Sequence, residues 1–171
     1  MQDIMEATGL EKGGIYRHFA GKQELAVAAY GYAVNQAFAA RLRHAEQMPD
    51  SINKLRAMIK GFIEHPSPVA GGCPLMNLGT DADDTNPELR SLALSSLQAW
   101  KAWIIRTVEE GKSAARLRSD TDSEGVANQI VATLEGALLI SRLERNHKAL
   151  EHAGDSLERF LDKIEKAHDS E

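Results

Sequence analysis

Met1 to Leu25 read MQDIMEATGLEKGGIYRHFAGKQEL, and this stretch carries the strongest pattern in the chain. It predicts a short helix over 3–7, which Thr8-Gly9 ends because glycine readily adopts the left-handed conformation found at helix C-termini. A second short helical segment follows over 10–19, with apolar residues spaced between polar ones. Two short helices joined by a glycine turn are a helix-turn-helix candidate.

The second short segment is positively charged, although the chain as a whole is acidic. Residues 12–22 hold three cations, one histidine and no acid, in a chain with a formal net charge of -5. A helix that reads DNA in the major groove must be short and must present donors to phosphates and base edges. Gly13 and Gly14 have no side chains, so the backbone there can approach DNA closely. A solvated basic face on an ordinary helical hairpin is the alternative interpretation.

The rest of the 171-residue chain is predicted to be helical. Its length fits one domain, or one domain with a small module, and its supply of Ala, Leu, Glu, Lys and Arg favours helices over strands. Asp50-Ser51 and Asn86-Pro87 are helix-start signals, and a further helix is predicted to begin near Asp122. Apolar residues recur at three- and four-residue steps, without an alternating strand pattern. The predicted fold class is all-α, with helical segments over 22–47, 52–63, 87–111, 122–143 and 157–164.

Several classes of protein are excluded by what the sequence lacks. Cys73 is the single cysteine, so no disulfide can form within the chain, and this usage fits a reducing cytosol. Neither a signal peptide nor a run of about 18 apolar residues is present. The histidines are dispersed, and neither a phosphate-binding glycine loop nor a Ser-His-Asp arrangement is recognisable. We therefore expect a cytoplasmic protein that is not an enzyme and that binds no metal or cofactor.

Groups of residues within the first 25 positions form one connected pattern: Asp3-Ile4, Ala7-Thr8-Gly9-Leu10, Lys12-Gly13-Gly14-Ile15-Tyr16, His18-Phe19 and Lys22-Gln23-Glu24-Leu25. This pattern closely resembles the DNA-binding signature of TetR-family transcriptional regulators. The resemblance implies a ligand-responsive repressor that binds a near-palindromic DNA operator as a homodimer. It also implies a helix-turn-helix DNA-binding domain over 1–25 and a helical ligand-binding and dimerisation domain over 26–171.

The resemblance assigns roles to individual residues of the N-terminal domain. The residues that would contact phosphate are Lys12, Tyr16, His18 and Lys22. Those that would lie near bases or backbone are Gly13, Gly14 and Arg17. Family members carry a further helix before the residues that match Met1-Gln2-Asp3, so the three-helix DNA-binding domain is incomplete in this sequence. We therefore expect weak or absent operator binding, and the alternative function is a dimeric helical small-molecule-binding protein that does not bind DNA.

A small-molecule effector, of a kind that the sequence does not identify, is implied among the central helices. Candidate pocket residues are mostly large or adaptable side chains: Met58, Phe62, Cys73, Met76, Trp100, Trp103 and Leu139. Ordinary core packing is the alternative for each of them. Cys73 sits in Gly71-Gly72-Cys73-Pro74, where a lowered pKa would make it a sensor of oxidants or electrophiles, and a buried packing residue is the alternative.

The last two predicted helices carry more apolar surface than one core needs. The segment 126–143 is apolar on more than one face, and the last helix carries a clean apolar stripe. Two copies related by a two-fold axis would bury both surfaces as a four-helix bundle between subunits. The predicted interface residues are Ala127, Val131, Leu134, Leu138, Leu157, Phe160, Leu161 and Ile164. The alternative is that earlier helices of the same chain cover these surfaces.

Overall fold

The computed structural model describes residues 1–65, 71–82 and 86–166, and it is all-α as predicted. None of the helices in these ranges is both long enough and apolar enough to cross a membrane. The described helices are α1 (Gln2–Thr8), α2 (Lys12–Ile15), α3 (Lys22–Ala45), α4 (Ser51–Glu64), α5 (Pro74–Ala82), α6 (Pro87–Ser113), α7 (Ser123–Glu144) and α8 (Lys148–Ile164).

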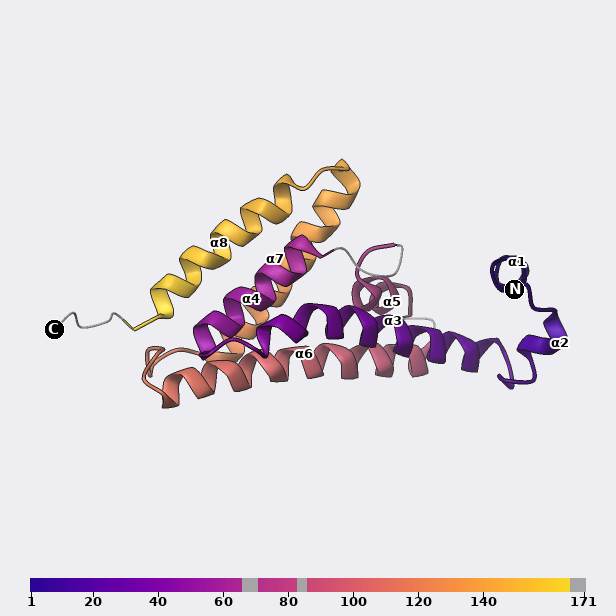
Figure 1. Cartoon of the computed structure of the whole chain (residues 1–171), viewed down its shortest axis with the longest axis horizontal. Helices are drawn as coiled ribbons and strands as arrows, with labels where there is room; N and C mark the ends of the chain where they lie inside the picture. Colours follow the sequence, from indigo (N-terminus) through magenta and orange to yellow (C-terminus); the bar gives the residue numbers. More distant parts are fainter. Residues whose placement is uncertain (66–70, 83–85, 167–171) are drawn as a thin grey trace.

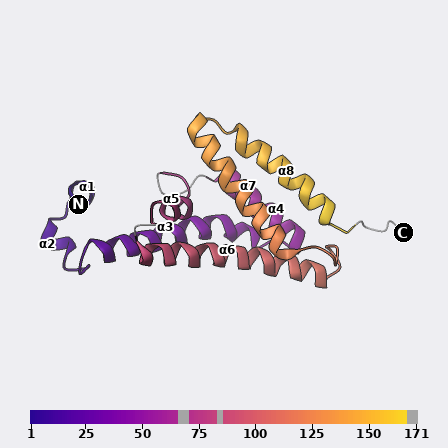
Figure 2. The same cartoon turned by 180° about the vertical axis from the view of Figure 1, so that it is seen from behind.

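Two long helices, α3 and α6, set the long axis of the molecule. They run side by side in the same direction, and α1 and α2 project beyond their N-terminal end (Figure 1). Helices α7 and α8 form a hairpin that packs against α4, as the reverse view also shows (Figure 2). The short helix α5 lies against α3 and α6 near the middle of the molecule. The chain therefore has a small N-terminal head, residues 1–21, and a larger helical body.

Several helix ends follow the predicted capping signals. The Oδ1 atom of Asp50 accepts a hydrogen bond from the Asn53 backbone N–H at 2.9 Å. Asn86 accepts from the Leu89 N–H at 3.1 Å, and Asp122 accepts from the Glu124 N–H at 3.2 Å. Each such cap stabilises the helix by about 1 kcal/mol, because it supplies an acceptor for a backbone N–H that has no partner within the helix. Gly9 ends α1 with φ 69°, in the left-handed conformation that the sequence predicted.

Two short elements differ from the predictions. The segment predicted as helical over 10–19 is a helix only over Lys12–Ile15, followed by a turn. Gly13 and Gly14 make up half of this short helix, and each costs about 1 kcal/mol relative to alanine, which disfavours a longer helix. Helix α5 was not predicted, since Gly71, Gly72 and Pro74 together mark a loop. Pro74 is its first residue, a position at which proline is favoured because no N–H is needed there.

The centre of the body is filled by aromatic side chains. The Trp100 ring stacks almost parallel on Phe62, with centroids 5.7 Å apart and an interplanar angle of 10°. Phe38 meets the same indole edge-on, with centroids 5.5 Å apart. On the other side of Phe62, the Arg41 guanidinium lies 4.1 Å from the ring centroid. These stacked and edge-to-face pairs are the arrangements that aromatic quadrupoles favour, so this region is a packed core.

Candidate functional site

The exposed face of the head contains the residues predicted to contact DNA. The side chains of Lys12, Tyr16, Arg17, His18 and Lys22 are all exposed. A Cβ atom added to Gly13 would meet no heavy atom within 4 Å, so the backbone there faces open space. Gly14 differs, because its added Cβ would lie 3.9 Å from Leu10, in the turn between α1 and α2. The structure therefore leaves the predicted cations of residues 12–22 open to solvent.

The head has little apolar packing of its own in the described structure. Ile15 is buried, whereas Ile4 and Leu10 are exposed, and α1 has no buried residue. A polar contact links the first turn of α3 with α6 instead. The Gln23 Nε2 atom donates to the Asn86 Oδ1 atom and to a Glu88 carboxylate oxygen, each at 3.0 Å, and Asn86 Nδ2 donates back to Gln23 at 2.8 Å. The helix that follows the head is thus attached to the N-terminus of α6.

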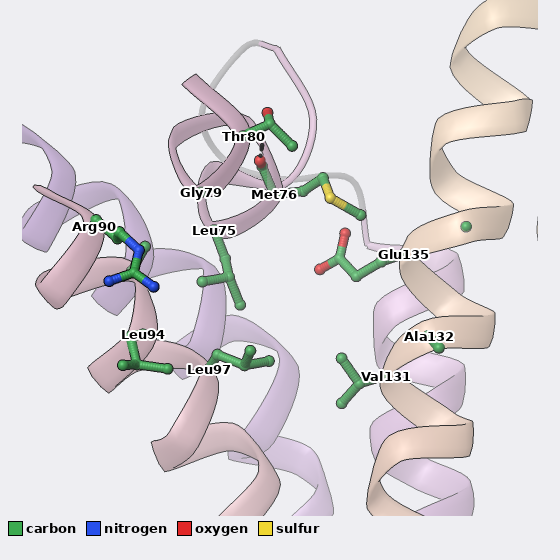
Figure 3. A pocket seen from close by; sticks show the side chains of 12 residues that line it. Leu75, Met76, Gly79, Thr80, Arg90, Leu94, Leu97, Val131, Ala132 and Glu135 are labelled. Carbon is green, nitrogen blue, oxygen red and sulfur yellow. Dashed lines mark hydrogen bonds between the residues drawn. The ribbon is translucent and has the colours of Figure 1, made fainter. Parts of the chain in front are cut away.

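The body contains an apolar cavity of about 540 Å³ between α5, α6 and α7. Figure 3 shows side chains of all three helices converging on it. Its size falls in the usual range of small-molecule sites, roughly 300–1,000 Å³. The lining residues are Leu75, Met76, Gly79, Thr80, Arg90, Ala93, Leu94, Leu97, Val131, Ala132, Glu135 and Gly136.

Glu135 is the acidic residue in this lining. Its side chain extends from α7 toward α5 and the cavity (Figure 3), and the residue is only 5% exposed. Neither carboxylate oxygen has a hydrogen-bond partner of normal geometry. Burial raises the pKa of Glu135, and interactions with the Cys73 thiol and the Arg41 guanidinium oppose that rise without cancelling it.

Cys73 and Arg41 lie behind Glu135, away from the cavity lining. Both are buried, and the Arg41 Nη1 atom is 3.9 Å from the Cys73 sulfur. Burial and the neighbouring Glu135 carboxylate raise the pKa of the Cys73 thiol to about 11. The prediction of a lowered pKa is therefore wrong, and the packing alternative describes this cysteine. In the part of the chain that the structure describes, no group of three or more His, Cys, Asp or Glu side chains could hold a metal ion.

The predicted pocket residues do not line one common cavity. Met58, Phe62, Trp100 and Trp103 are packed in the core, and Leu139 is exposed on the outer face of α7. Of the seven candidates, Met76 alone lines the 540 Å³ cavity. The two tryptophans border a separate hollow of about 400 Å³ beside α3 and α6. The residues that make the larger cavity were missed because each is unremarkable in sequence, and only the fold places Leu75, Leu97 and Glu135 on three converging helices.

The predicted dimer surface also needs correction. Ala127, Leu134, Leu157 and Leu161 are at most 1% exposed within the single chain, so a second subunit cannot reach them. They form the contact between α7, α8 and the rest of the body, which is the alternative that the sequence left open. The residues Val131, Leu138, Phe160 and Ile164 are partly buried against the same core.

An exposed apolar stripe does remain on α7, on a different face of the helix from the buried Ala127 and Leu134. Leu139, Ile140 and Leu143 are exposed, with Leu143 reaching 76%. Gly136 lies one helical turn before Ile140 and is partly exposed, and Ala132 lies two turns before it and is exposed. These five residues are called the α7 stripe below.

A small exposed basic head on a larger helical body that holds an apolar cavity defines a helix-turn-helix transcriptional regulator. Residues 1–29 match the family of bacterial regulatory proteins named tetR, and residues 51–157 match the tetracyclin repressor-like C-terminal domain. The chain therefore belongs to the TetR family of transcriptional regulators, and the resemblance seen in its first 25 residues is confirmed.

Individual relatives support the same assignment. The chain is 26% identical to the HTH-type transcriptional repressor DhaR of Mycobacterium sp. (strain GP1), over 88% of this chain and 76% of that one. A TetR transcriptional regulator of Chloroflexus aurantiacus is 36% identical, with a TM-score of 0.91 over 96% of this chain and 85% of that one. A TetR-family regulator of Cytophaga hutchinsonii is 30% identical, with a TM-score of 0.91 over 98% and 84% of the two chains.

Proposed function

We propose that this regulator is a cytoplasmic, ligand-responsive repressor that binds a near-palindromic DNA operator as a homodimer. The observation that carries the proposal is the placement of α6. This helix supplies Arg90, Leu94 and Leu97 to the cavity, and its N-terminal cap is hydrogen-bonded to Gln23 beside the head. One rigid element thus contacts both the proposed effector site and the start of the helix that carries the head.

DNA contact is assigned to the exposed cations of the head. Lys12 and Lys22 would neutralise phosphates, Arg17 would lie near bases or backbone, and the short helix α2 would enter the major groove of one half-site. Gly13 faces open space, which lets the backbone approach the duplex. The similarity to DhaR, which is named a repressor, supports repression as the outcome.

The effector would act by favouring one spacing of the two heads over another. A ligand shifts such an equilibrium only by the difference between its affinities for the two arrangements. Because the cavity is formed by α5, α6 and α7 together, filling it changes how α6 sits against its neighbours. The hydrogen bonds between Gln23 and Asn86 would pass that change to α3.

Dimerisation is assigned to the α7 stripe. An exposed apolar row on one helix is favourable only when another surface covers it, and a two-fold axis lets two identical rows cover each other. Phe160 on α8 is partly buried and would extend the contact. Two heads related by that axis would meet two operator half-sites in opposite orientation, which is why the operator is expected to be near-palindromic.

DNA binding is tested by selecting duplexes from a random-sequence library with the full chain. Fluorescence anisotropy at two salt concentrations then measures affinity for the enriched duplex. As the sequence predicts, we expect any affinity to be weak; it should fall steeply with salt, and Arg17→Ala should weaken it about tenfold or more. The matched control is Lys60→Ala, which removes an exposed cation on α4, far along the chain from the head. If the protein enriches no duplex while its cavity binds small molecules, the alternative function holds. The protein is then a ligand-binding dimer that does not bind DNA.

A further inference from the structure

The Glu135 carboxyl group is in an environment that an ordinary core residue avoids. It is buried and borders an apolar cavity, and neither oxygen has a hydrogen-bond partner of normal geometry, although the Cys73 thiol interacts with it. A buried polar group without a partner costs about 1–3 kcal/mol, so most such groups in proteins are satisfied. Figure 3 shows the carboxyl directed from α7 into the space between Leu75 and Val131. A ligand in that space is within reach of it.

The surroundings of Glu135 determine which polar group would suit it. Behind the carboxyl, the Arg41 guanidinium supplies a positive charge. A cationic ligand would therefore meet a positive charge behind the one acid of the lining. An anionic ligand would meet the acid itself in an apolar cavity. The remaining lining is almost entirely carbon, so a charged ligand head would be poorly solvated there.

We propose that Glu135 selects the effector, which is a neutral and mostly apolar molecule whose single polar head donates a hydrogen bond to the Glu135 carboxyl. Alcohols and primary amides have this chemistry. The proposal rests on the proposed use of the cavity as the effector site. It adds the residue that reads the polar head and the class of molecule that is accepted.

The experiment compares four probes with one apolar skeleton and different heads. They are 4-tert-butylbenzyl alcohol, its methyl ether, 4-tert-butylbenzylamine and 4-tert-butylbenzoate. Dissociation constants are measured for the full chain by calorimetry and ligand-observed NMR. The wild-type protein should bind the alcohol about tenfold more tightly than the ether, because the ether cannot donate to Glu135. The charged amine and benzoate should both bind more weakly than the alcohol.

Three variants separate the role of Glu135 from that of the cavity. Glu135→Leu should bind the alcohol and the ether equally, since no acceptor remains. Glu135→Gln keeps an acceptor oxygen but adds an NH2 donor that the ether can accept from, so its preference for the alcohol should be smaller than that of the wild type. Leu94→Trp fills the cavity from a half-exposed position on α6 and should weaken all four probes. Thermal unfolding followed by circular dichroism checks that each variant is folded, and the Gln variant gives the answer if the Leu variant does not fold.

The outcomes separate the two proposals. Equal binding of alcohol and ether by the wild type, abolished by Leu94→Trp, would overturn the role of Glu135 and leave the cavity as the effector site. Tightest binding of the amine or the benzoate would overturn the neutral class. Binding of no probe to the wild type would overturn this inference and remove the support that the cavity gives to ligand response, while DNA binding is measured independently.

Discussion

The side chains of Gln23 and Asn86 exchange two hydrogen bonds in opposite directions, at 3.0 and 2.8 Å, although 63 positions separate them in the sequence. Asn86 also caps α6 through the Leu89 N–H, and Gln23 is the second residue of α3. The pair therefore joins the N-terminal ends of the two longest helices. It is the contact through which we expect a change in the cavity to reach the head.

Removing this contact should uncouple the two sites more than it weakens either of them. In Gln23→Ala, the affinity for 4-tert-butylbenzyl alcohol and the affinity for DNA without ligand should change little, since the pair lies at the surface. The ratio of DNA affinities with and without the probe should fall several-fold, because coupling energies of about 1–3 kcal/mol rest on such contacts.

Asn86→Asp is the matched variant for this coupling. Aspartate still caps the helix and still accepts from Gln23, but it cannot donate back, so α6 should keep its stability while the coupling falls less than in Gln23→Ala. Anisotropy titrations with and without the probe measure both quantities. An unchanged ratio in both variants would show that the signal passes elsewhere.

Two glycines offer a matched test of the packing in the body. A Cβ atom at Gly111 would lie 2.7 Å from the Leu117 Cδ1 atom and against the Ser51 hydroxyl, so Gly111→Ala should destabilise the fold by about 1–3 kcal/mol. A Cβ at Gly136 would meet nothing within 4 Å, so Gly136→Ala should be neutral or stabilising by up to about 1 kcal/mol. Urea unfolding measures both, and similar changes in the two variants would contradict the packing described around Gly111.

The buried Glu135 carboxyl predicts a specific pH dependence of stability. Because burial raises its pKa in the folded state above the ordinary value of 4.5, the folded protein holds this proton more tightly than the unfolded chain. Its contribution to stability is fully present below the ordinary pKa and is lost as pH rises through the folded pKa. The groups that interact with it are Arg41 and the Cys73 thiol, whose pKa of about 11 keeps it neutral in this range.

Glu135→Gln removes this titration. The free energy of unfolding of the wild type, relative to that of the Gln variant, should therefore fall as the pH is raised from about 4.5. Urea unfolding of both proteins across this pH range provides the measurement. A difference that stays constant with pH would mean that Glu135 has the same pKa in the folded and unfolded states.

The α7 stripe predicts how the dimer would be broken. Leu143→Glu places a charge on the most exposed large residue of this apolar contact, so the protein should sediment as a monomer at micromolar concentration while keeping its helical circular dichroism. Tyr32→Glu is the control, because Tyr32 is an exposed apolar residue on α3, outside the stripe. A wild-type protein that sediments as a monomer, or a Leu143→Glu protein that remains a dimer, would remove the assignment of this face.

Features that depend on a few neighbouring residues were predictable from the sequence. The turn at Gly9 and the caps at Asp50, Asn86 and Asp122 follow from local backbone chemistry, and each is present. The DNA-binding pattern is also local, because it lies within one stretch of 25 residues.

Features that depend on how helices turn toward one another were not predictable. Leu134 and Leu139 lie on the same apolar segment, yet one is fully buried in the chain and the other is half exposed. The rotation of α7 that decides between them is set by packing against α6 and α8. Glu135 lines the cavity because α5 and α6 converge on α7, and no local sequence pattern indicates that arrangement.

The continuity of α3 has a mechanical consequence. Its 24 residues run without a break from the edge of the head into the body, and at 1.5 Å per residue this is a rod of roughly 36 Å. A tilt of about 5° at the body end would carry the far end through about 3 Å, close to the rise of one DNA base pair. Small angular changes in the body are thus amplified by leverage, and repacking a few side chains is enough to move a head out of register with its groove.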